Sequence, residues 1–289
     1  MLAILNKELR SYFYSATAYV FMGIFLLLAG LFFVMTNILG TQPNTYYTGV
    51  LSTLVFVFLL LSPVLTMKIV SEETKTKTDQ LLYTSPQTIT TIIVAKYLAA
   101  VILFLITLLI TVLFPLILSL FGKVAALEIL TAYIGFFLLG ICLIAIGIFV
   151  SSLTDNQVVS AVGTFGISLC IWLLDMIQQG LPTTRVSGII FALIIVAILV
   201  SILYSSTKNI IVSFITAIVG LGTIATIYLY KKELFEGFIV KFFSWFSLLA
   251  RNTQFSMGIL SLDSIIYYIS FSFIFVFLTI RMIEKRRWS

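Results

Sequence analysis

Residues 129–154 read ILTAYIGFFLLGICLIAIGIFVSSLT and contain no charged side chain. An α-helix rises 1.5 Å per residue, so roughly 20 apolar residues cross a hydrocarbon core about 30 Å thick. Backbone groups left unpaired in lipid cost several kcal/mol each, so a stretch of this kind crosses the membrane as a helix. The sequence therefore predicts a transmembrane helix at about 127–152.

Comparable charge-free intervals occupy most of the remaining chain. They are residues 11–67, 97–122, 186–207, 209–230 and 264–280. We predict eight membrane helices, at about 17–38, 50–70, 94–120, 127–152, 156–177, 186–205, 209–230 and 264–283. The pair within 186–230 forms either two short spans or a re-entrant pair, and the second alternative leaves six spans. The predicted fold class is an all-α polytopic membrane protein, a bundle of six to eight transmembrane helices with eight favoured. The alternation typical of membrane β-strands is absent.

The composition agrees with a chain that lies in lipid along its whole length. Of its 289 residues, 61% are hydrophobic and only 10% are charged, whereas soluble domains carry about 25% charged residues. We therefore predict a single transmembrane domain over residues 1–289. Cys142 and Cys170 lie inside apolar spans, and we interpret both as small core residues.

The distribution of basic residues predicts the orientation. An even number of spans places both termini on one side, together with Lys7, Arg10, Lys68, Lys75, Lys77, Lys96, Lys208, Arg281, Lys285, Arg286 and Arg287. The opposite side carries Lys123, Arg185, Lys231, Lys232, Lys241 and Arg251. Lys and Arg concentrate in cytoplasmic loops, so both termini are predicted to be cytoplasmic. The net charge of +6 reflects this orientation and anionic lipid. Basic residues scattered over both faces argue against a nucleic-acid partner.

Two of three non-spanning segments are interpreted as interfacial. Residues 1–15 predict an interfacial helix, because Leu2, Leu5, Leu9 and Tyr12 recur at three- and four-residue spacing while Lys7 and Arg10 lie elsewhere on the wheel. The alternative is a simple lead-in to the first span. Residues 231–263 mix charges with aromatic residues and predict outer interfacial or re-entrant helices. An aromatic belt is favoured there over a substrate-exit surface.

The third segment, residues 68–96, predicts a cytoplasmic hairpin. Six of the twelve residues from Lys68 to Asp79 are charged, and Ser85-Pro86 suits the start of a second helix. Leu81, Leu82 and Tyr83 add an apolar cluster to this polar segment. Such a cluster packs either on a partner or back on the membrane bundle, and the residues by themselves leave both open.

Several function classes lack the residues they need. The chain has no histidine and no phosphate-binding loop, which argues against an enzyme, a metal site or a bound cofactor. An ion-coupled secondary transporter or channel would need a polar site near the bilayer midplane, and no carboxylate pair is predicted there. Asp175 with Gln178 is a candidate outer vestibule, although a hydrated helix-end acid explains Asp175 as well.

Four stretches carry a resemblance to a known family. They are NKELRSYFYS at 6–15, SEETKTKTDQLL at 71–82 followed by Ser85-Pro86 and Lys96, SSLTDNQ at 151–157, and LDSIIYY at 262–268 running to Arg286-Arg287-Trp288. The chain resembles the ABC-2 type permeases, and more narrowly the branch of gliding-motility-associated permeases. It departs from the pattern at Lys77-Thr78, where the family has Gly-Thr, and at Asp79-Gln80, where Glu is common.

The resemblance implies a non-catalytic permease subunit of an ATP-driven exporter in the bacterial plasma membrane, working by alternating access. Its implied partners are cytoplasmic ATPase subunits that bind ATP and Mg, and a second permease chain in a homo- or heterodimer. The presence of an accessory extracytoplasmic subunit is left open. The residues that match the ATPase-coupling part of the family are Glu72, Glu73, Asp79, Gln80, Leu81, Leu82 and Tyr83. Charge reversal at Glu72 and Glu73 is expected to uncouple transport without unfolding the protein. The alternatives are a secondary transporter or channel that acts without an ATPase, and a structural or immunity-type membrane protein.

Overall fold

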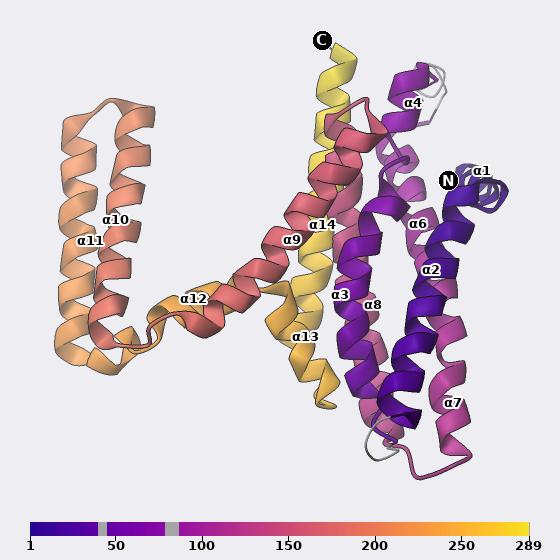
Figure 1. Cartoon of the computed structure of the whole chain (residues 1–289). Helices are drawn as coiled ribbons and strands as arrows, with labels where there is room; N and C mark the ends of the chain where they lie inside the picture. Colours follow the sequence, from indigo (N-terminus) through magenta and orange to yellow (C-terminus); the bar gives the residue numbers. More distant parts are fainter. Residues whose placement is uncertain (40–44, 79–86, 289) are drawn as a thin grey trace. The chain divides into compact units, whose positions relative to one another are not determined.

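The computed structural model describes residues 1–39, 45–78 and 87–288, which form helices and short connections and contain no strand (Figure 1). This confirms the all-α fold class. The chain forms two compact units, Met1–Trp172 together with Leu248–Ser289, and Leu173–Ser247. The prediction of a single domain stays a prediction.

Among the described residues, eight helices are long and apolar enough to cross a membrane. They are Ala16–Ile38, Thr48–Thr76, Ile89–Ser119, Ala126–Leu153, Gln157–Gln178, Arg185–Ser206, Ile210–Tyr230 and Leu262–Arg286. Each corresponds to one of the eight predicted spans, with ends that differ by a few residues. The pair within 186–230 consists of two helices that are each long enough to span.

The first unit is built around α8 (Ala126–Leu153). It packs against α14 (Leu262–Trp288), α3 (Thr48–Thr66), α13 (Leu248–Ser256) and α6 (Ile89–Thr111). Close approach depends on small residues, as is usual where membrane helices cross. A Cβ at Gly147 would lie 2.2 Å from the Thr66 hydroxyl on α3.

The core of this unit is largely aromatic. Phe25 and Phe58 meet edge to face with ring centroids 6.3 Å apart, and the ring centroid of Phe104 lies 4.3 Å from that of Phe58. Phe136 on α8 completes the cluster, 5.8 Å from Phe104. Phe25 comes from α2 (Ala16–Phe33), which continues into a π-helix at Val34–Ile38, so four helices meet at these rings.

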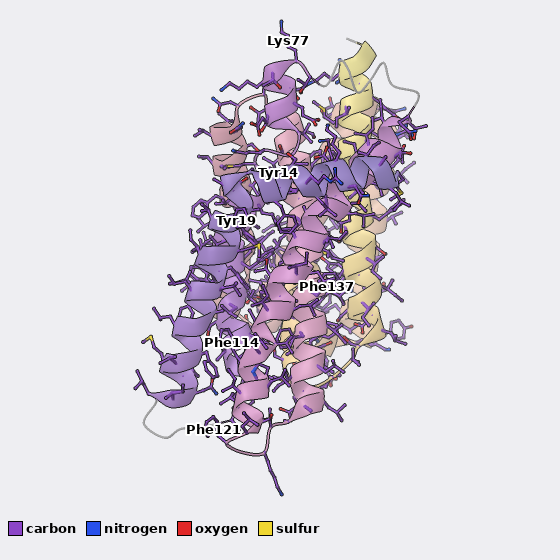
Figure 2. The ribbon with its side chains drawn as sticks, turned by 90° about the vertical axis from the view of Figure 1, so that its right-hand side faces the viewer. Tyr14, Tyr19, Lys77, Phe114, Phe121 and Phe137 are labelled. Atoms are coloured by element: carbon purple, nitrogen blue, oxygen red, sulfur yellow. The ribbon has the colours of Figure 1, made fainter. Side chains whose placement is uncertain are left out.

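Two helices of this unit lie outside the regular bundle. The helix α1 (Leu2–Tyr14) crosses the ends of the spanning helices, and Figure 2 shows it nearly perpendicular to them. The short helix α4 (Ser71–Thr76) follows α3, and Figure 1 places it at the same end as both termini. At the other end, α7 (Leu113–Ser119) follows α6 after a break at Val112.

The two cysteines differ in burial, so one of the two predictions is wrong. Cys142 is buried on α8 and lies 3.1 Å from the Tyr268 carbonyl oxygen, as a core residue does. Cys170 on α9 (Gln157–Gly180) is exposed. The buried face of α9 is instead a stripe of hydroxyl residues, Ser160, Thr164 and Ser168.

The second unit contains a helical hairpin, α10 (Arg185–Thr207) and α11 (Ile210–Tyr230). Lys208 adopts φ 49° between them, and the Asn209 side chain caps the first turn of α11. A 3₁₀ turn at Lys232–Phe235 and α12 (Phe238–Phe246) follow. Phe191 of α10 packs on Phe242 of α12, with ring centroids 5.4 Å apart.

The predicted outer segment 231–263 therefore consists of short helices with different surroundings. Trp245 on α12 is exposed, which suits an aromatic belt. Phe255 on α13 is fully buried, and its backbone carbonyl accepts a hydrogen bond from Thr131 of α8. The belt interpretation is wrong for Phe255, because α13 packs into the core of the first unit.

Candidate functional site

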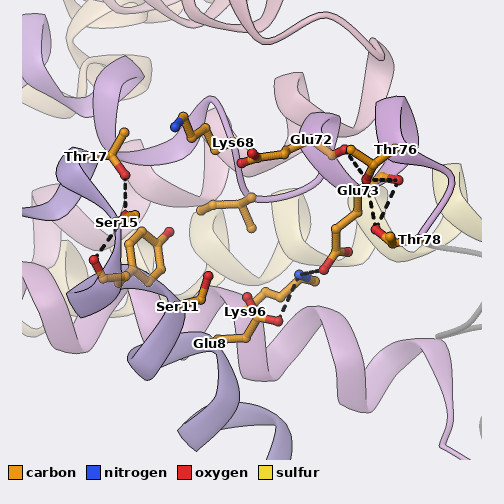
Figure 3. A pocket seen from close by; sticks show the side chains of 12 residues that line it. Glu8, Ser11, Ser15, Thr17, Lys68, Glu72, Glu73, Thr76, Thr78 and Lys96 are labelled. Atoms are coloured by element: carbon orange, nitrogen blue, oxygen red, sulfur yellow. Dashed lines mark hydrogen bonds and ion pairs between the residues drawn. The ribbon is translucent and has the colours of Figure 1, made fainter.

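A buried lysine joins three helices at the end of the first unit that carries α1 and α4. Lys96 on α6 is 2% exposed, and its Nζ lies 2.7 Å from Glu73 Oε1 of α4 and 3.1 Å from Glu8 Oε1 of α1 (Figure 3). We call Glu8, Glu73 and Lys96 the charge cluster. Taking two charges out of water costs several kcal/mol per ion, and only close pairing offsets that cost.

The sequence around Lys96 explains why the charge is buried. Ile89, Ile92, Ile93, Ala99, Ala100 and Leu103 are all buried on α6. Lys96 has the same three- and four-residue spacing, so it lies on the packed face of the helix. A lysine there requires an acid from a neighbouring helix, and α1 and α4 each supply one.

The helix α1 contributes Glu8 through its packed face. Glu8 is the buried residue of this helix, and the Tyr12 hydroxyl, one turn further, donates to the Leu65 carbonyl oxygen of α3 at 3.3 Å. Burial raises the pKa of the Tyr12 hydroxyl above its ordinary value of 10, and the nearby Glu8 charge raises it further. Tyr12 therefore stays protonated and keeps donating at physiological pH.

The junction between α3 and α4 is held by a serine on α8. Ser151 Oγ accepts from the backbone N–H groups of Val70 and Ser71, at 3.2 and 3.1 Å. The same hydroxyl donates to the Met67 carbonyl oxygen at 3.2 Å. These bonds satisfy backbone groups that the helix break exposes, so α4 is anchored to the central helix of the unit.

The last spanning helix also contacts α4. Arg286 Nη1 lies 3.1 Å from Asp155 Oδ1, in the connection between α8 and α9, and donates to Thr74 Oγ1 of α4 at 3.4 Å. The helix α4 therefore bonds to α6, α8 and α14, and Lys96 of α6 links it to Glu8 of α1. A displacement of α4 would act on the first three directly and on α1 through Lys96.

The helix α4 ends in a left-handed residue that is not glycine. Lys77 adopts φ 57° and ψ 19°, and the Thr78 N–H donates to the Glu73 carbonyl oxygen at 3.0 Å. This is a helix C-terminus at which glycine is normally preferred. Lys77-Thr78 is also the position at which the family that the sequence resembles has Gly-Thr. The lysine therefore replaces glycine at a residue whose backbone conformation is strained for any other side chain.

We predict that Lys77→Gly stabilises α4 by about 0.5–1 kcal/mol, because glycine adopts this conformation without the Cβ clash. Amide hydrogen exchange at Thr78 should slow about two- to fivefold, the factor that this free energy gives. Lys75→Gly, inside the same helix, is the matched control and should destabilise it by about 1 kcal/mol. Equal exchange in Lys77→Gly and the wild type would contradict the interpretation.

A polar cavity of about 310 Å³ lies beside the charge cluster. Lys68 and Glu72 line it together with the hydroxyl groups of Ser11, Ser15 and Thr17 (Figure 3). Ser15 and Thr17 hydrogen-bond each other at 2.6 Å, where α1 turns into α2. Water-accessible polar groups thus surround the buried pair, as expected at a membrane–water boundary.

The structure places the predicted coupling residues in three different ways. Glu73 is paired with Lys96 of the same chain, and its role in coupling stays a prediction. Glu72 is exposed, lines the same polar cavity as Glu73, and has no ion pair within the described part of the chain. Asp79, Gln80, Leu81, Leu82 and Tyr83 lie outside the described residues, so their role stays a prediction.

The other predicted site residues lie on α1 and near the end of α9. Lys7 and Arg10 are exposed on α1, and Lys7 Nζ lies 3.7 Å from Glu8 Oε1. In the second unit, Asp175 Oδ1 accepts a hydrogen bond of 2.9 Å from Ser247 Oγ. Gln178 is partly buried. The outer vestibule at Asp175 and Gln178 stays a prediction.

Sequence reasoning missed the charge cluster, although one signal pointed to it. The sequence places Lys96 among the cytoplasmic basic residues, and Glu8 enters only as part of the stretch NKELRSYFYS at 6–15. The spacing of Lys96 on the apolar face of its helix indicates burial and hence the need for an acid. The sequence does not identify which acidic residues pair with Lys96.

The described residues hold no group of three or more His, Cys, Asp or Glu that would fit a metal ion. The family described as ABC-2 family transporter protein matches residues 36–182, just over half of the chain. That range includes α3, α4, α6 and α8, and with them Glu73, Lys96 and Ser151. A search of curated proteins gave no match.

Proposed function

The chain belongs to the ABC-2 family of transporter proteins and is a multi-pass membrane component of a transporter; we propose that it is the permease subunit of an exporter driven by separate ATPase subunits. The observation that supports this most directly is the charge cluster. It ties α4, the segment that resembles the ATPase-contacting part of the family, to the transmembrane helix α6 and to α1.

In this proposal α4 receives the motion of the ATPase. Separating Glu73 from Lys96 would remove the cation from a largely buried carboxylate and would leave the buried Lys96 with Glu8 as its remaining acid, which opposes the separation. A push on α4 is therefore expected to move α1 and α6 with it rather than break the pair. Ser151 extends the same motion to α8, and a change between two helix arrangements biased by nucleotide would follow.

The finer assignments belong to the same proposal. The basic residues support cytoplasmic termini, and the resemblance supports a bacterial plasma membrane, the gliding-motility-associated branch and a second permease chain. ATP and Mg would bind to the partner ATPase, with no catalytic residue supplied by this chain. Alternating access is the transport mechanism that this assembly implies.

The proposal predicts that Glu72→Lys weakens ATPase binding without unfolding the chain. Glu72 is exposed on α4, so its reversal leaves the charge cluster intact while opposing basic residues of a partner. We expect about fivefold less ATPase to co-purify with tagged permease from native membranes in mild detergent. This is the change in affinity that follows from losing ~1 kcal/mol of binding free energy at a surface ion pair.

Lys123→Glu, a reversal near the opposite end of the unit, is the control and should retain the ATPase. If the wild-type chain purifies alone and stable, the ATP-driven proposal fails. Ion flux through liposomes that hold only this chain would then favour the alternative, a secondary transporter or channel. Normal ATPase recovery with Glu72→Lys would overturn the role of Glu72 only.

A further inference from the structure

An apolar groove of about 700 Å³ runs between α6–α7 and α8 in the first unit. Its floor is formed by Leu108, Ile129 and Leu138, which are each less than 10% exposed. Its walls are formed by Leu109 and Leu130, which are more than half exposed. Both sides of the groove belong to helices that are long and apolar enough to cross the membrane.

The polar side chains along the groove are already satisfied by the protein. The Tyr133 hydroxyl lies 3.1 Å from Thr111 Oγ1 and donates to the Tyr47 hydroxyl at 3.3 Å, both away from the groove. Ser119 Oγ donates to the Leu116 carbonyl oxygen at 2.6 Å. A polar molecule in the groove would lose its hydrogen bonds to water and find none in return, which costs several kcal/mol.

The length of the groove suits one acyl chain. It extends from Leu105 to Ser119, which is about 20 Å at the rise of an α-helix. One leaflet supplies about half of a hydrocarbon core that is about 30 Å thick, so a chain that crosses one leaflet can lie along the groove. The exposed walls Leu109 and Leu130 leave it open at the apolar surface of two helices that can cross the membrane, where acyl chains are the surrounding solvent.

We propose that this groove holds one acyl chain of a bilayer phospholipid, in the leaflet away from α1 and α4. The helix break at Val112 and the turn that carries Pro115 create the space. In Figure 2, Phe121 lies at this end of the unit and Phe137 lies about midway along it. The lipid headgroup would lie near Lys123, which is exposed beyond the last turn of α7. This inference rests on the membrane fold and not on the proposed transport function.

The test uses the full chain in liposomes that contain a phospholipid with a photoactivatable diazirine midway along one acyl chain. Labelled residues are mapped by mass spectrometry after irradiation. We expect label on the floor residues Leu108, Ile129 and Leu138, at least fivefold above that on other side chains of equal burial. Leu130→Trp fills the groove from one wall and should lower the floor label severalfold.

Leu127→Trp is the matched control, because Leu127 is exposed on the same helix but does not line the groove. It should leave the floor label unchanged. Leu109→Trp repeats the test from the other wall, and elution as a single species shows that each variant is folded. Floor label at background level, or floor label that Leu130→Trp and Leu109→Trp leave intact, overturns the proposal. A dimer that cross-links through the groove and dissociates in these variants also overturns it, in favour of a second copy as the occupant.

Discussion

Replacing Lys96 by methionine should destabilise the protein by about 3–5 kcal/mol, the cost of removing one partner of a buried ion pair. Methionine fills the same space on the packed face of α6, so lost volume contributes little. What remains is two carboxylates, Glu8 and Glu73, with side chains only 12% and 20% exposed, and the cation left near Glu8 is Lys7, whose side chain is 60% exposed. The midpoint of thermal unfolding in detergent should fall accordingly, and amide exchange in α1 and α4 should become faster.

The control is a variant in which the whole cluster is neutral, Glu8→Gln with Lys96→Met and Glu73→Gln. Buried ion pairs are often replaceable by neutral groups at little cost in stability, so this triple variant should recover most of what the single change loses. A single variant that loses less than about 1 kcal/mol, or a triple variant no more stable than the single one, would contradict the assignment of the cluster as a buried ion pair.

The same variants separate stability from coupling. If the charge cluster transmits motion from α4, the complex that carries the folded triple variant should still hydrolyse ATP while transporting little. If the cluster serves only to hold the fold, both activities should be retained.

Charge reversal should act differently at the two acids of α4. Glu73→Lys places a second ammonium group beside Lys96 and should destabilise the protein, whereas Glu72→Lys should not.

Gly147→Ala is the second change with a large expected effect, a loss of about 1–3 kcal/mol from overpacking. The added Cβ would lie 2.2 Å from Thr66 Oγ1 and 2.7 Å from Thr66 Cβ, so α3 and α8 must move apart. Ser151 lies one turn further along α8, and its hydrogen bonds to Val70 and Ser71 should weaken with that movement. Thermal unfolding should report the loss, and hydrogen exchange at Val70 and Ser71 should become faster.

Two further variants test this explanation. Gly23→Ala has no atom within 4 Å of the new Cβ and should be neutral or slightly stabilising, because alanine favours the helix over glycine. Combining Gly147→Ala with Thr66→Gly removes the clashing side chain, and the two changes should show a clear coupling energy. If Gly147→Ala behaves like Gly23→Ala, the close contact between α3 and α8 is not the reason for the glycine.

The membrane architecture was predictable because its cause is local. A charge-free stretch such as residues 129–154 must satisfy its backbone within itself, and only a helix does so in lipid. Within 186–230 the structure has two helices, Arg185–Ser206 and Ile210–Tyr230, that are each long and apolar enough to span, which agrees with the favoured count of eight. Which face of a helix packs is harder to predict from the sequence. Cys170 illustrates this, because α9 exposes the cysteine and buries the hydroxyl groups of Ser160, Thr164 and Ser168 instead.

The charge cluster shows where sequence reasoning reaches its limit. The sequence identified Glu73 as an important acid and assigned it an external partner, while the structure pairs it with Lys96, 23 residues away, and pairs Lys96 with Glu8, 88 residues away. In the same way, Gly147 is an ordinary helix residue in the sequence and a contact point with Thr66 in the fold. The sequence by itself determined which segments are helical and cross the membrane, because hydrophobicity and backbone hydrogen bonding act along one segment at a time. Only the tertiary structure decided which charges pair and which helices touch, because those choices depend on how distant segments pack side by side.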